Sequence, residues 1–322
     1  MFKGPLGFSF DIRDTFAVPN IARNAEMMNE AWQRSQYACD VDGIVSVDPV
    51  FIQKMVEING NVTLEDGTVL TGKNTAEYML NTIYKEVPVS LQDTYFEYIA
   101  STIMNNAFSN MDITKMMKVA RSIGELTRNR HFYAYTFHDD EAKYFQGAGL
   151  AKGTPDSETD PEVGIYLNEQ NPSKLGWYID RKAQITKTGQ NADGSKTYHV
   201  TYTLTNTLTS SEMATCTGYI LGGEQAGVTG KPVAAPGTSA QRMLFYAPKG
   251  GSISEITSSG DVRDQSNAVM DDQKLVTNVA YIAPGESVTF DFDVTTSPKA
   301  ESDLTIDQTP SGKVTNEVNY QY

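Results

Sequence analysis

The hydrophobic pattern of this chain changes character between Gly149 and Glu162. Before that segment, apolar residues recur at spacings of three and four, which is the period of amphipathic helices. After it, short β-branched and aromatic runs are separated by Gly, Pro, Asn and Asp, which is typical of strands joined by turns. Residues 151–161 carry no apolar period and indicate a linker. Because 322 residues also exceed what one hydrophobic core usually serves, the sequence predicts an α+β protein of two domains, residues 1–150 and 162–322.

The first domain is predicted to mix helices with short strands. A helix is expected over 19–32 and a buried strand over 44–47. Asp48 then stands where an N-cap belongs and Pro49 at the first helical position of a second helix that ends at Gly60. The pair Asp66-Gly67 predicts a hairpin with a two-residue type I′ turn. Three more helices are expected over 74–128, then a strand near 131–137 and a helix from about 139.

The second domain is predicted to be an antiparallel β-sandwich of the immunoglobulin-like kind. Seven runs with strand character lie between turn residues, and their number and spacing fit such a sandwich. Its aromatic residues either fill the core or line a carbohydrate or peptide groove, and core positions are favoured because the inward side of sandwich strands is normally apolar. These residues are Trp177, Tyr178, Tyr198, Tyr202, Phe245 and Tyr246.

Charge narrows the classes of partner. The formal net charge is −14 and the pI is near 4.7, which argues against nucleic acid because affinity for phosphates comes from Lys and Arg. The same acidity disfavours docking on an anionic membrane surface, although one basic cluster would be invisible in the total. The sequence contains no apolar run of the ~18 to 20 residues that span a bilayer. We therefore expect no nucleic-acid partner and no direct membrane insertion by this chain.

The sequence offers no catalytic or metal-binding constellation. His131, His138 and His199 show no ligand spacing, and Cys39 and Cys216 lie far apart, so we expect no metal or other cofactor. The two cysteines are interpreted as buried thiols, with a bridge between them as the less favoured alternative. The acidic clusters at 40–48 and 139–141 are interpreted as turn and helix-start residues. Nothing in the residues themselves indicates an enzyme.

Residues 41–80 resemble the surface proteins of Gram-positive actinobacteria known as the domain of unknown function 4012 family. That family shows a D-G-V-hydrophobic-x-V-D-P-V segment followed by a G-P-V-T-L-x-D-G-T-x-L hairpin, although Asn61 stands here in place of the family's Pro. The matching residues are Asp42, Gly43, Val47, Asp48, Pro49, Val50, Gly60, Val62, Thr63, Leu64, Asp66, Gly67, Thr68 and Leu70. Further on, Ser173, Lys174, Leu175 and Tyr178 resemble a Ser-Lys-Met/Leu-x-x-Tyr pattern of the same family.

This resemblance implies a cellular location but does not identify an activity. Family members usually carry a cytoplasmic N-terminus, one transmembrane helix and a large extracellular part, so we expect this chain to be the outer portion of a membrane-anchored parent protein at the cell surface. More distantly, the hairpin region is similar to the second half of the LytR-CpsA-Psr domain, which implies an α/β fold that an upstream segment could complete. Members of that family attach glycopolymers to the cell wall from a lipid pyrophosphate carrier, and an arginine-rich stretch grips the pyrophosphate. Residues 84–99 here hold Lys85 and no arginine.

Two functional hypotheses follow from these observations. The first is a non-catalytic envelope module that binds cell-wall glycopolymer or a surface protein, because no catalytic constellation is present. The second is a divergent LytR-CpsA-Psr-like transferase, which rests on the distant similarity alone. The missing arginines favour the first.

Overall fold

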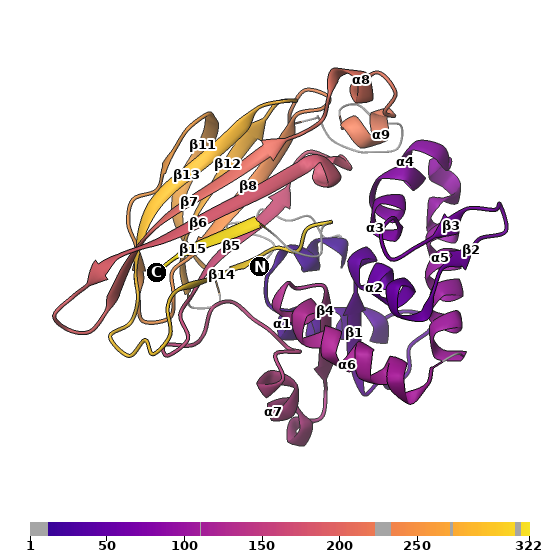
Figure 1. Cartoon of the computed structure of the whole chain (residues 1–322), viewed down its shortest axis with the longest axis horizontal. Helices are drawn as coiled ribbons and strands as arrows, with labels where there is room; N and C mark the ends of the chain where they lie inside the picture. The colour runs from indigo at the N-terminus through magenta and orange to yellow at the C-terminus, as the bar shows by residue number, and fades with distance from the viewer. Residues whose placement is uncertain (1–11, 110, 223–232, 271–272, 313–316) are drawn as a thin grey trace. The chain divides into compact units, whose positions relative to one another are not determined.

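The computed structural model describes residues 12–109, 111–222, 233–270, 273–312 and 317–322 (Figure 1). It is a mixed α+β structure, as the sequence predicts. The described residues divide into two compact units. The strand unit comprises 12–40, 153–309 and 317–322, and the helical unit comprises 41–152 with 310–312.

The helical unit consists mainly of helices, with two short two-stranded ladders. Its elements are β1 (Gly43–Val47), α2 (Pro49–Asn59), β2 (Val62–Thr63), β3 (Val69–Leu70), α3 (Thr75–Glu77), the π-helical η2 (Tyr78–Thr82), α4 (Ile83–Glu86), α5 (Val89–Ser109), α6 (Ile113–Arg128), β4 (Phe132–Thr136) and α7 (Asp139–Gly147). Residues from α2, the hairpin, α5 and the end of α6 form one buried cluster, to which Phe51, Ile52, Met55 and Val56 contribute as the helical period predicts. Phe51 stacks on Phe132 of β4 at a centroid distance of 5.2 Å.

The predicted helix boundaries in this unit follow local capping chemistry. Asp48 and Asp112 both accept backbone N–H bonds as N-caps, of α2 and α6 respectively, and Pro49 takes the first helical position. The Asp66-Gly67 turn differs from the prediction. A type I′ turn needs φ > 0 at both central residues, but here only Gly67 has a positive φ (86°). Leu64 and Thr68 close a three-residue loop instead, with the Leu64 N–H donating to the Thr68 carbonyl at 2.8 Å.

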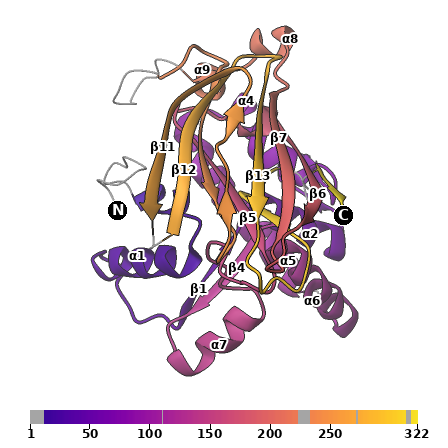
Figure 2. The ribbon, with the colours of Figure 1, turned by 90° about the vertical axis from the view of Figure 1, so that its left-hand side faces the viewer.

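The strand unit contains two large sheets. Its strands are β5 (Glu162–Glu169), β6 (Ile179–Gln190), β7 (Lys196–Asn206), β8 (Ser239–Tyr246), β9 (Ser252–Ile253), β10 (Thr257–Ser258), β11 (Asp261–Met270), β12 (Gln273–Ile282), β13 (Ser287–Thr295), β14 (Thr305–Gln308) and β15 (Glu317–Gln321). One sheet has the order β11-β12-β8-β5-β14, and the other has the order β10-β13-β7-β6-β15 with β9 also paired to β13. Figure 2 shows β11 beside β12 at the margin of the first sheet. The short helices of this unit are η1 (Ile12–Ala17), α1 (Ile21–Gln33), η3 (Leu175–Tyr178), α8 (Ser210–Met213) and α9 (Gly218–Leu221).

Inward residues of both sheets form one apolar cluster. On β7 the buried residues Tyr198, Val200, Tyr202 and Leu204 alternate with more exposed ones, which is the period of a half-buried strand. Five of the six aromatic residues singled out from the sequence are buried, and Trp177 is half-buried. Core positions are therefore the correct interpretation for five of them.

Three sequence-based expectations differ from this structure. The strand unit is not wholly antiparallel, because β14 runs parallel to β5 and β15 parallel to β6. Residues 12–40 belong to the strand unit and not with 41–150, because Val18 packs in a cluster with Tyr166, Leu244 and Tyr246 on the first sheet. Both cysteines are free, and Cys39 is exposed, so its prediction as a buried thiol was wrong.

Candidate functional site

Two aspartate–histidine pairs lie at opposite ends of the ladder formed by β1 and β4. The antiparallel register places Gly43 opposite Thr136 and Val47 opposite Phe132. Asp48 and His131 therefore lie just beyond one end of the ladder, and Asp42 and His138 lie just beyond the other. Sequence reasoning assesses the histidines by their spacing along the chain and misses both pairs, because the register brings together residues that are 83 and 96 positions apart.

The histidine of the Asp48–His131 pair is inaccessible to a substrate, whereas the Asp48 side chain is 28% exposed. The Asp48 Oδ2 lies 2.6 Å from His131 Nδ1, and its Oδ1 accepts the backbone N–H groups of Val50 and Phe51 at 2.9 and 3.0 Å. His131 is buried, and its Nε2 has no hydrogen-bond partner among the described residues. A general base must reach the proton that it removes. We therefore assign this pair a positional role, in which it joins the start of α2 to the start of β4.

The Asp42–His138 pair lies on the surface. Asp42 Oδ1 is 3.0 Å from His138 Nε2, and the Phe137 N–H donates to the Asp42 carbonyl at 2.9 Å. The hydrogen bond from Asp42 raises the pKa of His138 above its ordinary value, and the charges of Asp42, Glu141 and Asp140 add to the effect. This histidine therefore stays protonated to a higher pH than a free one.

Replacing Asp42 by asparagine is expected to lower the pKa of His138 towards its ordinary value of about 6.5. Because the pKa is raised in the folded state, the contribution of this pair to stability is present below about pH 6.5 and is lost as the pH rises through the folded pKa. NMR titration of the His138 ring protons measures the shift. Asp293→Asn, beside His199, is the control, and an unchanged His138 titration in Asp42→Asn would contradict the assignment.

The hairpin motif residues attach the hairpin to α5. Tyr95 of α5 donates its hydroxyl to Asp66 Oδ2 at 2.7 Å, and the Thr68 N–H donates to Asp66 Oδ1 at 2.9 Å. These two hydrogen bonds lower the pKa of the Asp66 carboxyl, the one from Tyr95 most. The Glu65 N–H donates to the hydroxyl of Tyr98, also on α5, at 3.2 Å. The conformation of Gly67 closes the turn, so both motif residues serve the shape of the hairpin.

The motif residues of the second domain hold the segment around η3 to α9. Ser173 Oγ accepts the Leu175 N–H at 3.4 Å, and the Lys174 N–H donates to the Ile220 carbonyl at 3.1 Å. Lys174 Nζ also lies 5.4 Å from the ring centroid of Tyr219. Tyr178 is buried, with its hydroxyl 3.6 Å from Cys216 Sγ. These three residues make local packing contacts and line neither of the two hollows described below.

An opening lies at one edge of the strand unit, and we call it the edge groove. Its volume is about 700 Å³, within the range of about 300 to 1,000 Å³ of ligand pockets. It is lined by Phe245, Ala247, Gly251, Ser252, Ile253, Asn267, Ala268, Val269, Lys274, Leu275 and Val276. The strands explain its position. β11 and β12 are ten residues long, whereas β9 and β10, beside β13 in the other sheet, have two residues each. The inner side of β11 thus lacks an equally long strand across from it.

The walls of the edge groove are mostly apolar. Phe245 is fully buried and packs edge-on against Phe290 and Phe292 at centroid distances of 5.2 and 5.6 Å. Val269 is instead 60% exposed, which is unusual for a valine on a long strand. Asn267, Ser252 and Lys274 supply the polar groups. An apolar surface with a few hydrogen-bonding groups suits the binding of a ligand.

Little in the sequence points to this groove. β11 carries the run 261–270, in which polar residues outnumber apolar ones, so the sequence does not predict it as a strand. β12 follows after a gap of two residues and overlaps the run 274–284 that the sequence predicts as a strand, so this short gap is the signal that could have identified the hairpin. Within the described ranges, no three histidine, cysteine or carboxylate side chains come close enough to hold a metal ion.

Comparison with known proteins bears on the N-terminal part of the chain. Residues 2–84 match the model of a family described as "Protein of unknown function (DUF4012)". The match to the DUF4012 family is confined to this segment. No curated protein matches the chain. A solved structure from Legionella pneumophila subsp. pneumophila, described as a "putative nutrient binding protein", is similar at 13% identity with a TM-score of 0.22. The similarity covers 43% of this chain and 44% of that one, so the chain spans less than half of its length.

The DUF4012 segment contains the motif aspartates but not their partners. Asp42, Asp48 and Asp66 lie inside residues 2–84, whereas His131, His138 and Tyr95 lie beyond them. The family-model match ends at residue 84, so it does not include Ser173, Lys174 and Tyr178, although these residues resemble a pattern of the same family. The three DUF4012 aspartates are thus anchors for later parts of the helical unit.

Proposed function

We propose that this chain is a non-catalytic binding module of the cell envelope that takes up an apolar segment of a surface protein in the edge groove. The proposal includes an extracellular location and a membrane anchor in the parent protein. Both follow from the family resemblance. None of the helices in the described residues has both the length and the apolar composition of a membrane span.

The observation that carries the proposal is the exposed apolar lining of the edge groove. Soluble proteins normally cover inward-facing residues of a sandwich, and an uncovered apolar hollow marks a binding site. Here Val269, Val276 and Ile253 surround an opening whose inner end is Phe245. A β-carbon on Gly251 would lie 2.2 Å from the Thr295 carbonyl oxygen, so glycine is required at this wall.

An extended polypeptide suits the groove because of the strand beside it. Among the described residues, β11 lies at the edge of its sheet and pairs with β12 alone. An edge strand offers unpaired backbone groups to an added strand, and a neighbouring apolar hollow accepts alternate side chains of that strand. We therefore expect the partner segment to be extended, with apolar residues at every second position.

Val269→Asp is expected to weaken peptide binding at least about tenfold, because an apolar contact is replaced by a charge that must lose water. Peptides selected by the native chain from a displayed library of extended apolar segments serve as ligands, and fluorescence anisotropy measures their affinity. Val89→Asp is the matched control, since Val89 is 59% exposed and lies on α5 of the helical unit. Equal affinity of Val269→Asp and the native chain, or no enriched peptide, would reject the groove as the site.

Cell-wall glycopolymer is a second candidate ligand, favoured by a different surface. A hollow of about 510 Å³ lies on the second sheet, lined by Lys182, Ala183, Gln184, Thr201, Thr203, Glu317, Val318 and Asn319. Six of these eight residues are polar and present amine, amide, hydroxyl and carboxylate groups, which could bond the hydroxyl groups of a polymer. Gln184→Ala with Asn319→Ala is expected to reduce co-sedimentation with purified wall polymer. Unchanged co-sedimentation would remove this candidate.

The transferase hypothesis has less support. The hairpin that resembles a pyrophosphate-handling fold directs Asp66 and Glu65 to tyrosines of α5. The Asp66 carboxylate and the Glu65 backbone N–H are thereby used in contacts within the helical unit. The resemblance to the LytR-CpsA-Psr domain therefore adds no catalytic residue to the proposal.

A further inference from the structure

Helix α6 carries two apolar stripes, and only one of them is covered. Leu126 is buried and Val119 packs against the core cluster of the helical unit. Ile113, Met116 and Met117 are 78%, 59% and 52% exposed. With Ala120, also exposed, they follow the i, i+3, i+4, i+7 spacing of one helix face. The N-terminal half of α6 thus presents to solvent a stripe that such helices usually bury.

Cations border the outer stripe. Between Ile113 and Arg128 the helix contains the four cations Lys115, Lys118, Arg121 and Arg128 and the single acid Glu125, so its net charge is 4 − 1 = +3, in a chain of net charge −14. At about 100° per residue, Arg121 lies about 40° around the helix from Met117 and Lys118 about 100° from it, both on the side of Met117 that faces away from Met116. The acid before the helix, Asp112, is used as its N-cap and accepts the Lys115 N–H at 2.8 Å.

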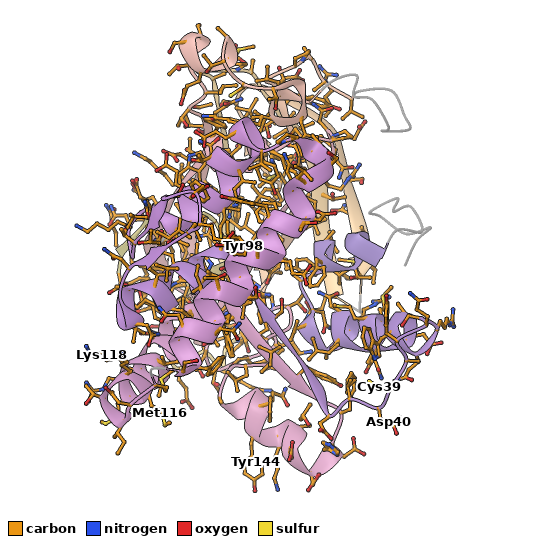
Figure 3. The ribbon with its side chains drawn as sticks, turned by 90° about the vertical axis from the view of Figure 1, so that its right-hand side faces the viewer. Cys39, Asp40, Tyr98, Met116, Lys118 and Tyr144 are labelled. Carbon is orange, nitrogen blue, oxygen red and sulfur yellow. The ribbon has the colours of Figure 1, made fainter. Side chains whose placement is uncertain are left out.

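A further exposed apolar side chain lies at the end of α5, the helix that precedes α6 in the chain. Phe108 is 66% exposed and stands one residue before the end of α5. From Ser101 to Ser109 the helix carries no charged residue. Figure 3 shows Met116 and Lys118 pointing outward from the same end of the helical unit. An apolar stripe with a cationic border is the pattern of helices that lie in a membrane interface.

We propose that the N-terminal half of α6, together with Phe108, docks on an anionic membrane surface. The cations attract anionic headgroups while the exposed apolar side chains enter the headgroup boundary. The five exposed apolar side chains are few beside the roughly 20 to 30 residues that each partner of a stable protein interface contributes. The acidic remainder of the chain is repelled by the same membrane, so the attraction is confined to this helix. This inference does not depend on the edge groove.

Vesicle co-sedimentation of the full chain tests the proposal. The native chain is expected to bind vesicles of phosphatidylcholine with 30% phosphatidylglycerol, and to bind pure phosphatidylcholine much less. Met116→Asp with Met117→Asp is expected to abolish binding. Lys118→Gln with Arg121→Gln is expected to lower the partition coefficient about 25-fold, and 0.5 M salt should weaken binding by the native chain. Circular dichroism checks that the helices of each variant persist.

Two control variants make the same chemical changes elsewhere. Val89→Asp with Leu91→Asp alters exposed apolar residues at the start of α5, and Lys249→Gln with Lys299→Gln removes two exposed cations of the strand unit. Both controls should bind anionic vesicles like the native chain. Failure of the native chain to bind, or equal losses in the controls, would overturn the proposal. A dimer that Met116→Asp with Met117→Asp dissociates, without vesicle binding, would instead assign the stripe to a second copy.

Discussion

Replacing Asp48 by alanine is expected to lower the free energy of unfolding of the helical unit by about 2 to 4 kcal/mol. Two losses combine in this variant. The N-cap of α2 disappears, since Asp48 Oδ1 no longer accepts the N–H groups of Val50 and Phe51. The buried His131 also loses the partner of its Nδ1, while its Nε2 already has none among the described residues. Chemical denaturation followed by circular dichroism measures the change.

The opposite end of the same ladder provides the control. Asp42→Ala removes a carboxylate from an exposed aspartate–histidine pair, so it should leave stability nearly unchanged. If the free energy of unfolding falls equally in Asp48→Ala and Asp42→Ala, the burial of His131 is not the reason for the loss. Asp48→Asn keeps an N-cap side chain and is expected to fall between the native chain and Asp48→Ala.

Replacing Glu169 by glutamine is expected to destabilise the strand unit by about 2 kcal/mol. Its Oε1 accepts the N–H groups of Ala240 and Asn171 at 2.9 and 3.0 Å. Its Oε2 accepts Ser239 Oγ and Gln241 Nε2 at 2.6 and 3.0 Å. Glutamine has one accepting oxygen, so its amide nitrogen would face two donors. Glu255→Gln, at an exposed position, is the control.

The same residue should make stability depend on pH. Burial raises the pKa of the Glu169 carboxyl above its ordinary 4.5, and hydrogen bonds from Ser239 and from the backbone of Ala240, Asn171 and Gln170 only partly oppose that rise. The folded chain therefore keeps a proton that the unfolded chain has lost, and its stability falls as the pH rises from about 4.5 through the folded pKa. Denaturation midpoints across this window measure the slope. A slope that persists in Glu169→Gln would exclude this carboxyl as its source.

Local signals in the sequence predict most elements of the helical unit. Helix α2 is bounded by Asp48 and Pro49 at its start and by Gly60 at its end. Each of these residues acts on the backbone next to it, so the sequence alone is enough to place α2 correctly. The alternation of apolar and polar residues along β7 likewise predicts which of its faces is buried. In α1 the pattern is less informative, because Ile21 and Ala25 are buried but Trp32 is exposed.

Features that depend on register could not be predicted in this way. His131 meets Asp48 only because β4 pairs with β1, and no spacing rule reveals that pairing. The edge groove depends on the short length of β9 and β10 relative to β11, which is a difference between two sheets. The exposed stripe of α6 resembles any core-facing stripe, because a helical period shows that a face is apolar without showing what covers it. The net charge likewise conceals the local cations of this helix.

The strand unit is interrupted in sequence by the helical unit, and this order has a consequence for how the chain is made. Residues 41–152 are contiguous, so they can form their hydrophobic core as soon as they have left the ribosome. The strand unit begins at 12–40, resumes at 153, and receives its parallel edge strands β14 and β15 last. β5 therefore waits about 140 residues for its neighbour β14, and pairing across such separations is slow. Chains shortened before residue 305 would present β5 and β6 as open edges prone to aggregation.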